Sequence, residues 1–209
     1  MKQWFITIDD APSRHTYKKI AYLVKHQIPA IFYCRGEHIE QYREQAEALI
    51  KAGFLIGNHS YCHQAYSQTC QKDFFADILR AEELIERCYK KAALVRPKKI
   101  IRLPFGDRGA TGSEEQIALQ NFLAQEGFER IDFACFTTDT SIDAPWSIDP
   151  QDYKRVNYEN PALYQKKFEE LCLNWHQETG VLLLHDFDHN HELFEPAIDF
   201  LRSQKWLFL

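Results

Sequence analysis

Apolar runs alternate with helically spaced apolar positions along this chain. The runs are short, rich in β-branched and aromatic residues, and mostly apolar at every position, which is typical of strands buried on both faces. They cover residues 4–8, 29–34, 54–56, 100–103, 131–136 and 181–184. Between them, apolar residues recur every three or four positions, which predicts amphipathic helices. These helical patterns cover residues 13–26, 37–52, 73–94, 114–126 and 161–178, and a last helix is expected to begin near Pro196.

The alternation of strand and helix predicts an α/β fold in which helices cover a parallel sheet. The chain has 209 residues and shows no internal repeat, low-complexity run or linker, so we expect a single domain over residues 1–209. The longest irregular stretch, residues 137–160, is long enough to be functional rather than a plain connection.

Aspartate, histidine and arginine residues, which are common in catalytic and metal sites, stand at the ends of several predicted strands. They are Asp9 and Asp10 after the first strand, His59 and His63 after the third, Arg102 at the end of the fourth and His185 at the end of the sixth. In parallel α/β folds, functional sites gather at the carboxyl ends of the strands. This shared location, more than any single motif, indicates a functional site.

The spacing of His59 and His63 is that of two ligands on one helical turn, where both imidazoles can share a cation. In zinc proteases a glutamate directly after the first histidine serves as general base. Ser60 occupies that place here, so a base must come from elsewhere in the chain. On spacing alone, a pair of surface histidines is an equally good interpretation, and the two aspartates alone fit a polar turn before a helix.

Considered together, these residues favour a metal-assisted hydrolase. An aspartate with His59 and His63 forms a facial triad that leaves positions open for water and substrate. The other aspartate is suited to act as base on the water, and His185 to protonate a leaving amine. Arg102 would keep the base aspartate ionised and oriented. The set predicts hydrolysis of an amide or ester.

Composition narrows the class of protein. Hydrophobic residues make up 45% of the chain and aromatic residues 14%, which is typical of a folded globular protein. The formal net charge of −5 gives no support for nucleic acid or an anionic membrane as the main partner. Six scattered cysteines without a C-x-x-C pair favour free thiols. No apolar run has transmembrane length and the first strand begins almost at once, so we expect a cytoplasmic protein.

Four short motifs follow one another along the chain. They read T-I-D-D-A-P-S at 7–13, G-N-H-S-Y-C-H at 57–63, R-L-P-F-G at 102–106 and L-L-L-H-D at 182–186. In sequence and order they resemble motifs of the polysaccharide deacetylases, the NodB-homology or carbohydrate esterase 4 family. The resemblance implies a distorted (β/α) barrel of about seven parallel strands. It also implies removal of N-acetyl groups from an amino sugar or N-acetylated saccharide.

The resemblance also implies a role for each residue. Carried over position by position, it makes Asp10, His59 and His63 the ligands of one divalent metal ion. Asp9 is then the base, Arg102 tunes Asp9, and His185 is the acid. By the same resemblance, the backbone N–H of Phe105 is an oxyanion donor. Zn²⁺ is the expected ion, with Co²⁺, Ni²⁺ and Mn²⁺ as alternatives.

Two motif positions depart from the family pattern. Ala11 replaces the usual glycine after the aspartate pair, which matters if the backbone there needs a positive φ. The fourth motif, usually D-x-x-D-W, is drawn here from residues 139–146 with different spacing. In that interpretation Asp143, or alternatively Asp139, is the partner of Arg102, and Trp146 forms a wall of the substrate pocket.

Two other functions stay open. Another C–N hydrolase on the same fold, similar to allantoinases or cyclic imidases, would act on ureido or imide groups, but such relatives tend to lose parts of the metal triad that this chain keeps. A non-catalytic sugar-binding module would need neither Asp9 nor His185. Because most relatives are exported and no leader is recognised here, we expect a small or oligomeric N-acetylated saccharide as substrate.

Overall fold

A parallel sheet forms the centre of the computed structural model, which describes residues 2–133 and 141–209. The sheet order is β3-β2-β1-β4, with β5 paired to the start of β1, and every pairing is parallel. The strands are β1 (Gln3–Ala11), β2 (Ile31–Cys34), β3 (Leu55–Asn58), β4 (Thr179–His185) and β5 (Leu207–Phe208). The predicted parallel α/β architecture is confirmed.

The central strand β1 is paired along both of its edges. Strand β4 pairs with β1 from Gln3 to Asp9 along one edge. The opposite edge of β1 is shared: β5 pairs with residues 3–4 and β2 with residues 7–11. The register to β2 shifts between Ile8 and Ala11. Such an irregularity changes the direction of side chains at the end of a strand, here where Asp9 and Asp10 lie.

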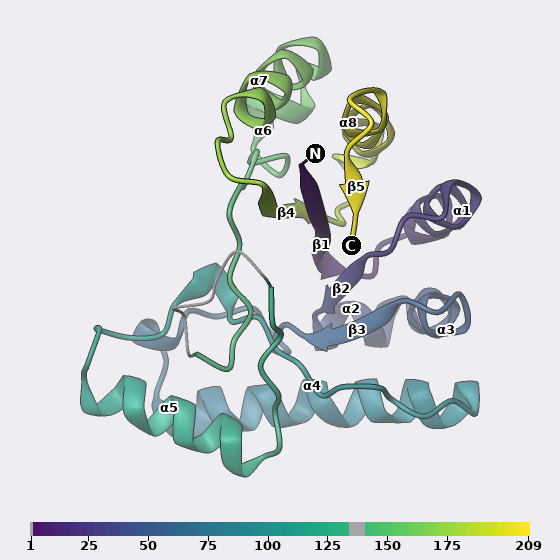
Figure 1. Ribbon diagram of the computed structural model, residues 1–209. Helices are drawn as coiled ribbons and strands as arrows, with labels where there is room; N and C mark the ends of the chain where they lie inside the picture. The colour runs from purple at the N-terminus through teal and green to yellow at the C-terminus, as the bar shows by residue number, and fades with distance from the viewer. Residues whose placement is uncertain (1, 134–140) are drawn as a thin grey trace.

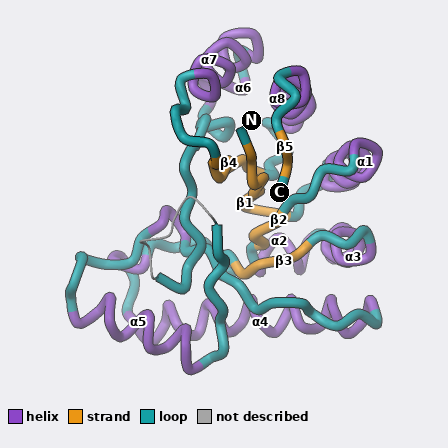
Figure 2. Tube along the Cα trace, viewed as in Figure 1, coloured by secondary structure: helices purple, strands orange, loops and turns teal. Residues whose placement is uncertain are grey.

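The helices lie outside the sheet, as Figures 1 and 2 show. They are α1 (Thr16–His26), α2 (Gly36–Gln41), α3 (Arg43–Lys51), α4 (Gln71–Ala92), α5 (Glu114–Gln125), α6 (Arg155–Tyr158), α7 (Pro161–Leu173) and α8 (His191–Ser203), with 3-10 turns η1 (Tyr66–Gln68) and η2 (Pro104–Gly106). The largest buried cluster joins β1 and β2 to the apolar faces of α1, α3, α4 and α8. A second cluster, which includes Phe74 and Leu119, packs α5 against the first half of α4.

Several elements differ from the sequence prediction. The helix expected at 37–52 is broken at Tyr42, whose φ of −125° and ψ of 49° are not helical. The last helix begins at His191 rather than near Pro196, which lies inside it. The strand expected at 100–103 is reduced to one bridge between Ile101 and Asn58. Residues 131–133 form no strand, and the rest of that predicted strand lies outside the described residues.

Isolated backbone contacts extend the sheet beyond its strands. Ile101 bridges to Asn58 beside β3, and Ile148 bridges to Leu182 beside β4. The N–H of Ala144 donates to the carbonyl of Ile101 at 2.8 Å, so the segment 144–148 links the two edges of the sheet. Within the described ranges, the five strands form an open sheet, and isolated bridges and backbone hydrogen bonds connect its two edges.

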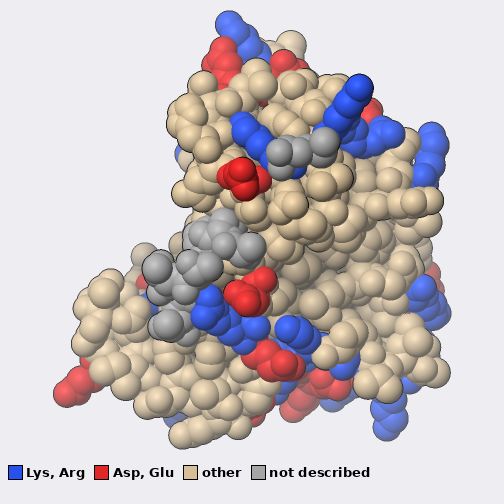
Figure 3. Space-filling view, viewed as in Figure 1, with Lys and Arg blue, Asp and Glu red and all other residues tan. Residues whose placement is uncertain are grey.

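The five described cysteines, Cys34, Cys62, Cys70, Cys88 and Cys172, are free thiols, and Cys135 lies outside the described residues. In residues 2–133 and 141–209, none of the helices combines the length and the apolar character that crossing a membrane requires. On the face drawn in Figure 3, basic and acidic side chains are interspersed.

Candidate active site

Loops at the carboxyl ends of β1, β3 and β4 bring the candidate residues together. Asp9 and Asp10 end β1, and His185 ends β4 as the register partner of Asp9. His59 directly follows β3. The structure places all of them, with His63, around one cavity of about 320 Å³. Its walls are Asp9, Asp10, His59, His63, Leu103, Phe105, Gly106, Trp146, Asp149, Tyr153, Leu183, His185 and Phe187.

The two histidines lie on a loop and not on the helical turn that their spacing suggested. Ser60 and His63 have positive φ angles of 61° and 58°, which a helix does not allow. The loop is stabilised by its own polar side chains and by α4: the Ser60 N–H donates to Asn58 Oδ1 at 2.8 Å, and the Tyr61 N–H donates to Asp77 at 2.7 Å. The two imidazole rings still approach to 4.8 Å between centroids.

Asp10, His59 and His63 offer ligand atoms that all lie within 4.8 Å of one another. The Nδ1 of His59 lies 2.8 Å from the carbonyl oxygen of Arg102. Because a carbonyl only accepts hydrogen bonds, Nδ1 carries the proton and Nε2 keeps its lone pair for a cation. Burial lowers the pKa of His59 to about 3 and that of His63 to about 2, so both rings are neutral, as metal ligands must be.

The carboxyl group of Asp10 fits a cation as well. Its Oδ1 is buried and has no hydrogen-bond partner among the described residues, while His63 Nε2 lies 3.5 Å away. Burial raises the pKa of Asp10 to about 7, an effect partly opposed by His185. The nearest cation, Arg35 Nη1, lies 3.7 Å from Asp10 Oδ1, which is too far for a hydrogen bond. A buried acceptor without a hydrogen bond is costly, and a bound cation would satisfy it. One carboxylate and two imidazoles suit a divalent metal ion with open coordination positions.

Asp9 is held by a buried arginine. The Nη1 of Arg102 donates to Asp9 Oδ1 at 2.8 Å, and the Arg102 side chain is fully buried. Arg102 is itself fixed by Thr7 Oγ1 at 2.8 Å and by the carbonyls of Ala144 and Pro145, each at 3.0 Å. The second oxygen of Asp9 lies 3.6 Å from His59 Nε2. Asp9 is therefore ion-paired and oriented next to the triad, as a base for an attacking water requires.

His185 has a carboxylate partner that the sequence analysis missed. Asp152 Oδ1 lies 2.7 Å from His185 Nδ1, and Asp152 Oδ2 accepts the His185 backbone N–H at 2.9 Å. Burial alone would lower the pKa of His185, but the charge and hydrogen bond of Asp152, with Asp9 and Asp10, raise it to about 9. At neutral pH the ring is protonated, which is the form a general acid needs.

The structure corrects the assignment of Asp143. Its carboxylate pairs with Arg108, whose Nε lies 2.9 Å from Asp143 Oδ2, while Arg102 pairs with Asp9. The backbone carbonyls that follow Asp143, and not its side chain, bind Arg102. The alternative partner, Asp139, lies outside the described residues.

Trp146 and Phe105 both line the cavity. A Cβ atom on Gly106 would lie 2.5 Å from the Trp146 ring, so glycine lets the loop after residue 103 pack against this wall. Phe105 is 68% exposed, has a φ of 59° and packs edge-on against His63. Both aromatic rings therefore present surface to a molecule in the cavity.

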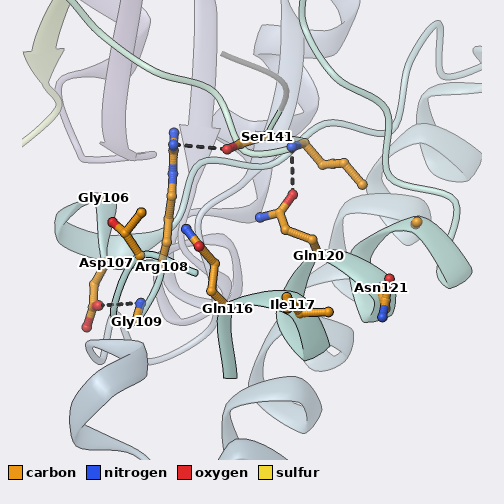
Figure 4. Close-up of a pocket in the computed structure, with 12 residues that line it drawn as sticks. Gly106, Asp107, Arg108, Gly109, Gln116, Ile117, Gln120, Asn121 and Ser141 are labelled. Carbon is orange, nitrogen blue, oxygen red and sulfur yellow. Dashed lines mark hydrogen bonds between the residues drawn. The ribbon is translucent and has the colours of Figure 1, made fainter. Parts of the chain in front are cut away.

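A larger hollow of about 840 Å³ begins at Gly106 and runs along α5 (Figure 4). Its walls are mainly polar: Arg108 donates to Ser141 Oγ at 3.0 Å, and Gln120 Oε1 accepts the Ile142 N–H at 2.9 Å. It contains neither the aspartate pair nor the histidines. We therefore place the reaction centre in the smaller cavity.

The family model described as polysaccharide deacetylase matches residues 1–120, more than half of the chain. The chain belongs to the polysaccharide deacetylase family. A peptidoglycan-N-acetylglucosamine deacetylase from Bacillus cereus is 26% identical over 153 residues, which is 73% of this chain and 46% of that relative. This chain thus spans about half the length of that relative.

Solved polysaccharide deacetylase structures share the fold. A polysaccharide deacetylase from Bacillus cereus superimposes with a TM-score of 0.74 at 19% identity, covering 100% of this chain and 91% of that one. A mutant of a pseudoenzyme of carbohydrate esterase family 4 superimposes with a TM-score of 0.69 at 16% identity, covering 99% and 64%. Because the fold includes a protein described as a pseudoenzyme, the activity must be argued from the site.

The structure clarifies two motif departures. Asp149-Pro150-Gln151-Asp152-Tyr153 keeps the D-x-x-D spacing, with tyrosine in place of tryptophan, and its second aspartate is the partner of His185. This pentapeptide, and not residues 139–146, is the better match to the fourth motif. Ala11 is tolerated because the positive φ in that turn, 58°, belongs to Asp10.

Proposed function

We propose that this chain is a metal-dependent N-deacetylase that removes acetyl groups from an N-acetylated amino sugar, as a small or oligomeric saccharide. The observation that carries the proposal is one cavity that combines three parts: the Asp10, His59 and His63 triad, the Asp9 carboxylate paired with Arg102, and the His185 imidazolium paired with Asp152. Each part has the protonation state or orientation that amide hydrolysis needs.

The triad would hold one divalent ion, and Zn²⁺ suits its nitrogen and oxygen donors best. When bound, such an ion acts as a Lewis acid on a carbonyl oxygen and makes water more acidic. Asp9 is placed to accept the proton of the water that attacks the acetyl carbonyl. The pairing with Arg102 supplies the opposite charge and fixes the direction of the Asp9 oxygens.

His185 completes the proton transfers. Amide cleavage requires protonation of the leaving nitrogen, because an amide anion is a very poor leaving group. With a pKa of about 9, His185 carries its proton at neutral pH and can deliver it from Nε2, since Nδ1 is bonded to Asp152. The Asp9 and His185 pair thus provides a base and an acid from neighbouring strands β1 and β4.

The cavity suits one sugar ring better than an extended surface. Its volume of about 320 Å³ lies within the range of small-molecule sites, about 300–1,000 Å³. Phe105, Trp146, Tyr153 and Phe187 supply apolar walls, and Asp149 supplies a hydrogen-bonding group. The relative from Bacillus cereus is described as acting on N-acetylglucosamine in peptidoglycan, which supports an N-acetylated sugar as the substrate class here.

The test compares two substrate classes with the zinc-loaded protein. Acetate and new primary amines are measured with N-acetylglucosamine oligomers of increasing length, and ring opening is measured with a cyclic imide; Asp9→Asn serves as the inactive control. Equal amounts of acetate and amine, absent in the control, would support the proposal. Imide opening without acetate release would favour the imidase-like alternative, and loss of both would favour a binding module.

A further inference from the structure

Residues 34–38, which we call the bridging segment, lead from the end of β2 into α2 and contact both loops that carry the proposed metal ligands. On one side, the carbonyl of Cys34 accepts the His59 N–H at 3.0 Å, and the Gly36 N–H donates to the Ser60 carbonyl at 2.9 Å. On the other side, the Arg35 N–H donates to the Ala11 carbonyl at 2.9 Å. The bridging segment therefore connects the turn after β1 to the loop after β3.

Gly36 allows this close approach. A Cβ atom at residue 36 would lie 2.3 Å from Tyr61 Cδ2 and 3.1 Å from Tyr61 Cα. Because the second of these atoms is backbone, any side chain at residue 36 would push the histidine loop away from the bridging segment. The separation between the two ligand-bearing loops is thus set by backbone contact.

Two side chains of the bridging segment reach Asp10 itself: Arg35 Nη1 lies 3.7 Å from its Oδ1, and His38 contacts its backbone. The Nδ1 of His38 lies 2.6 Å from the backbone carbonyl oxygen of Asp10. Since a carbonyl only accepts, Nδ1–H is the donor. Asp10 has a φ of 58°, a conformation that non-glycine residues adopt only when their surroundings hold them there. It directs a buried carboxylate, whose Oδ1 has no hydrogen-bond partner among the described residues, toward the two histidines.

We propose that His38 is a positioning residue that holds Asp10 in its left-handed conformation and so fixes the metal triad before the ion binds. His38 is not itself a ligand in this role, because the ligand atoms that lie within 4.8 Å of one another belong to Asp10, His59 and His63. The inference rests on the proposed function only in taking Asp10, His59 and His63 as the metal site. Residues that orient metal ligands typically contribute about 10–100-fold to metal affinity.

The experiment measures zinc affinity of the full chain, stripped of metal with a chelator, by competition with a chelating dye. His38→Phe keeps the ring and removes the donor. His38→Asn restores a donor, because its amide nitrogen can occupy the place of Nδ1. His26→Phe is the matched control: it removes a half-buried histidine from the last turn of α1, whose ring packs on Tyr22 and does not line the cavity of the proposed site. Melting temperatures of the metal-free proteins are measured in parallel.

We expect zinc affinity to fall about 10–100-fold in His38→Phe, to recover at least in large part in His38→Asn, and to stay within twofold of the parent in the control. Parent-like affinity in His38→Phe would overturn the role of His38. So would an equal loss in both His38 variants, which would indicate general disruption of the segment. If the parent chain binds no zinc, the proposed metal site itself fails, and that result is distinct from either of the others.

Discussion

The variant Asp152→Asn tests the contact between Asp152 and His185, which the sequence did not predict and the structure shows. The variant keeps the size of the side chain and removes the charge that faces His185 Nδ1 at 2.7 Å. His185 has an ordinary pKa of 6.5, raised to about 9 in the folded chain. At about 1.4 kcal/mol per pKa unit, this corresponds to about 3 kcal/mol in favour of the imidazolium.

The direction of the effect follows from the role of His185 as acid. In the parent, the ring is protonated below about pH 9, so kcat should be constant up to that pH and then fall. Without the Asp152 charge the pKa of His185 falls, because burial still lowers it and only Asp9 and Asp10 still raise it. The falling limb of kcat then moves to lower pH. On the alkaline side of the limb, we expect kcat to drop about tenfold for each unit of that shift.

The assay is acetate release by the metal-loaded protein between pH 5 and 10, with kcat and KM determined separately at each pH. Asp188→Asn is the matched control, because that aspartate lies on the loop that follows His185 but pairs with the exposed Arg14. A falling limb that stays near pH 9 in Asp152→Asn would refute the assignment of His185 as an acid controlled by Asp152.

Three further results are expected. Elemental analysis should find one divalent ion per chain in the parent and none in the double variant His59→Ala/His63→Ala; retention of the ion would place the metal elsewhere. Asp9→Asn should lower kcat by about 10²–10⁴ while zinc affinity changes little, and an active variant would rule out Asp9 as base. Lys19→Met breaks a buried ion pair to Asp186 of 2.6 Å, so urea unfolding should show a loss of about 3–5 kcal/mol. The control for that measurement is Arg87→Met, from an exposed i,i+4 pair with Glu83, which should cost about 0.5 kcal/mol or less.

The sequence predicted the sheet and its site edge because buried parallel strands carry a strong local signal. The apolar run 181–184 lies within β4, and the residues after β1, β3 and β4 meet at one cavity, as the carboxyl ends of parallel strands must. The strand expected at 100–103 was wrong for a physical reason. Beyond Asn58 the sheet continues through an isolated bridge at Ile101, and periodicity cannot distinguish a strand from an extended segment that forms only such a bridge.

The partners of the site residues were harder to predict, because they depend on tertiary contacts. The aspartate nearest the expected tryptophan motif, Asp143, pairs with Arg108 instead. Asp152 was overlooked although D-x-x-D occurs at residues 149–152, because tyrosine rather than tryptophan follows it. His38 gives no sequence signal at all: only the fold brings α2 against the Asp10 carbonyl.

The central claim is that this chain removes acetyl groups with the help of a metal ion held by Asp10, His59 and His63. The most direct measurement is acetate release from N-acetylglucosamine oligomers by protein stripped of metal, before and after one equivalent of Zn²⁺ is added. We expect no release from the stripped protein and restoration by Zn²⁺ in the parent, but no restoration in His59→Ala/His63→Ala. Equal acetate release with and without metal would contradict it.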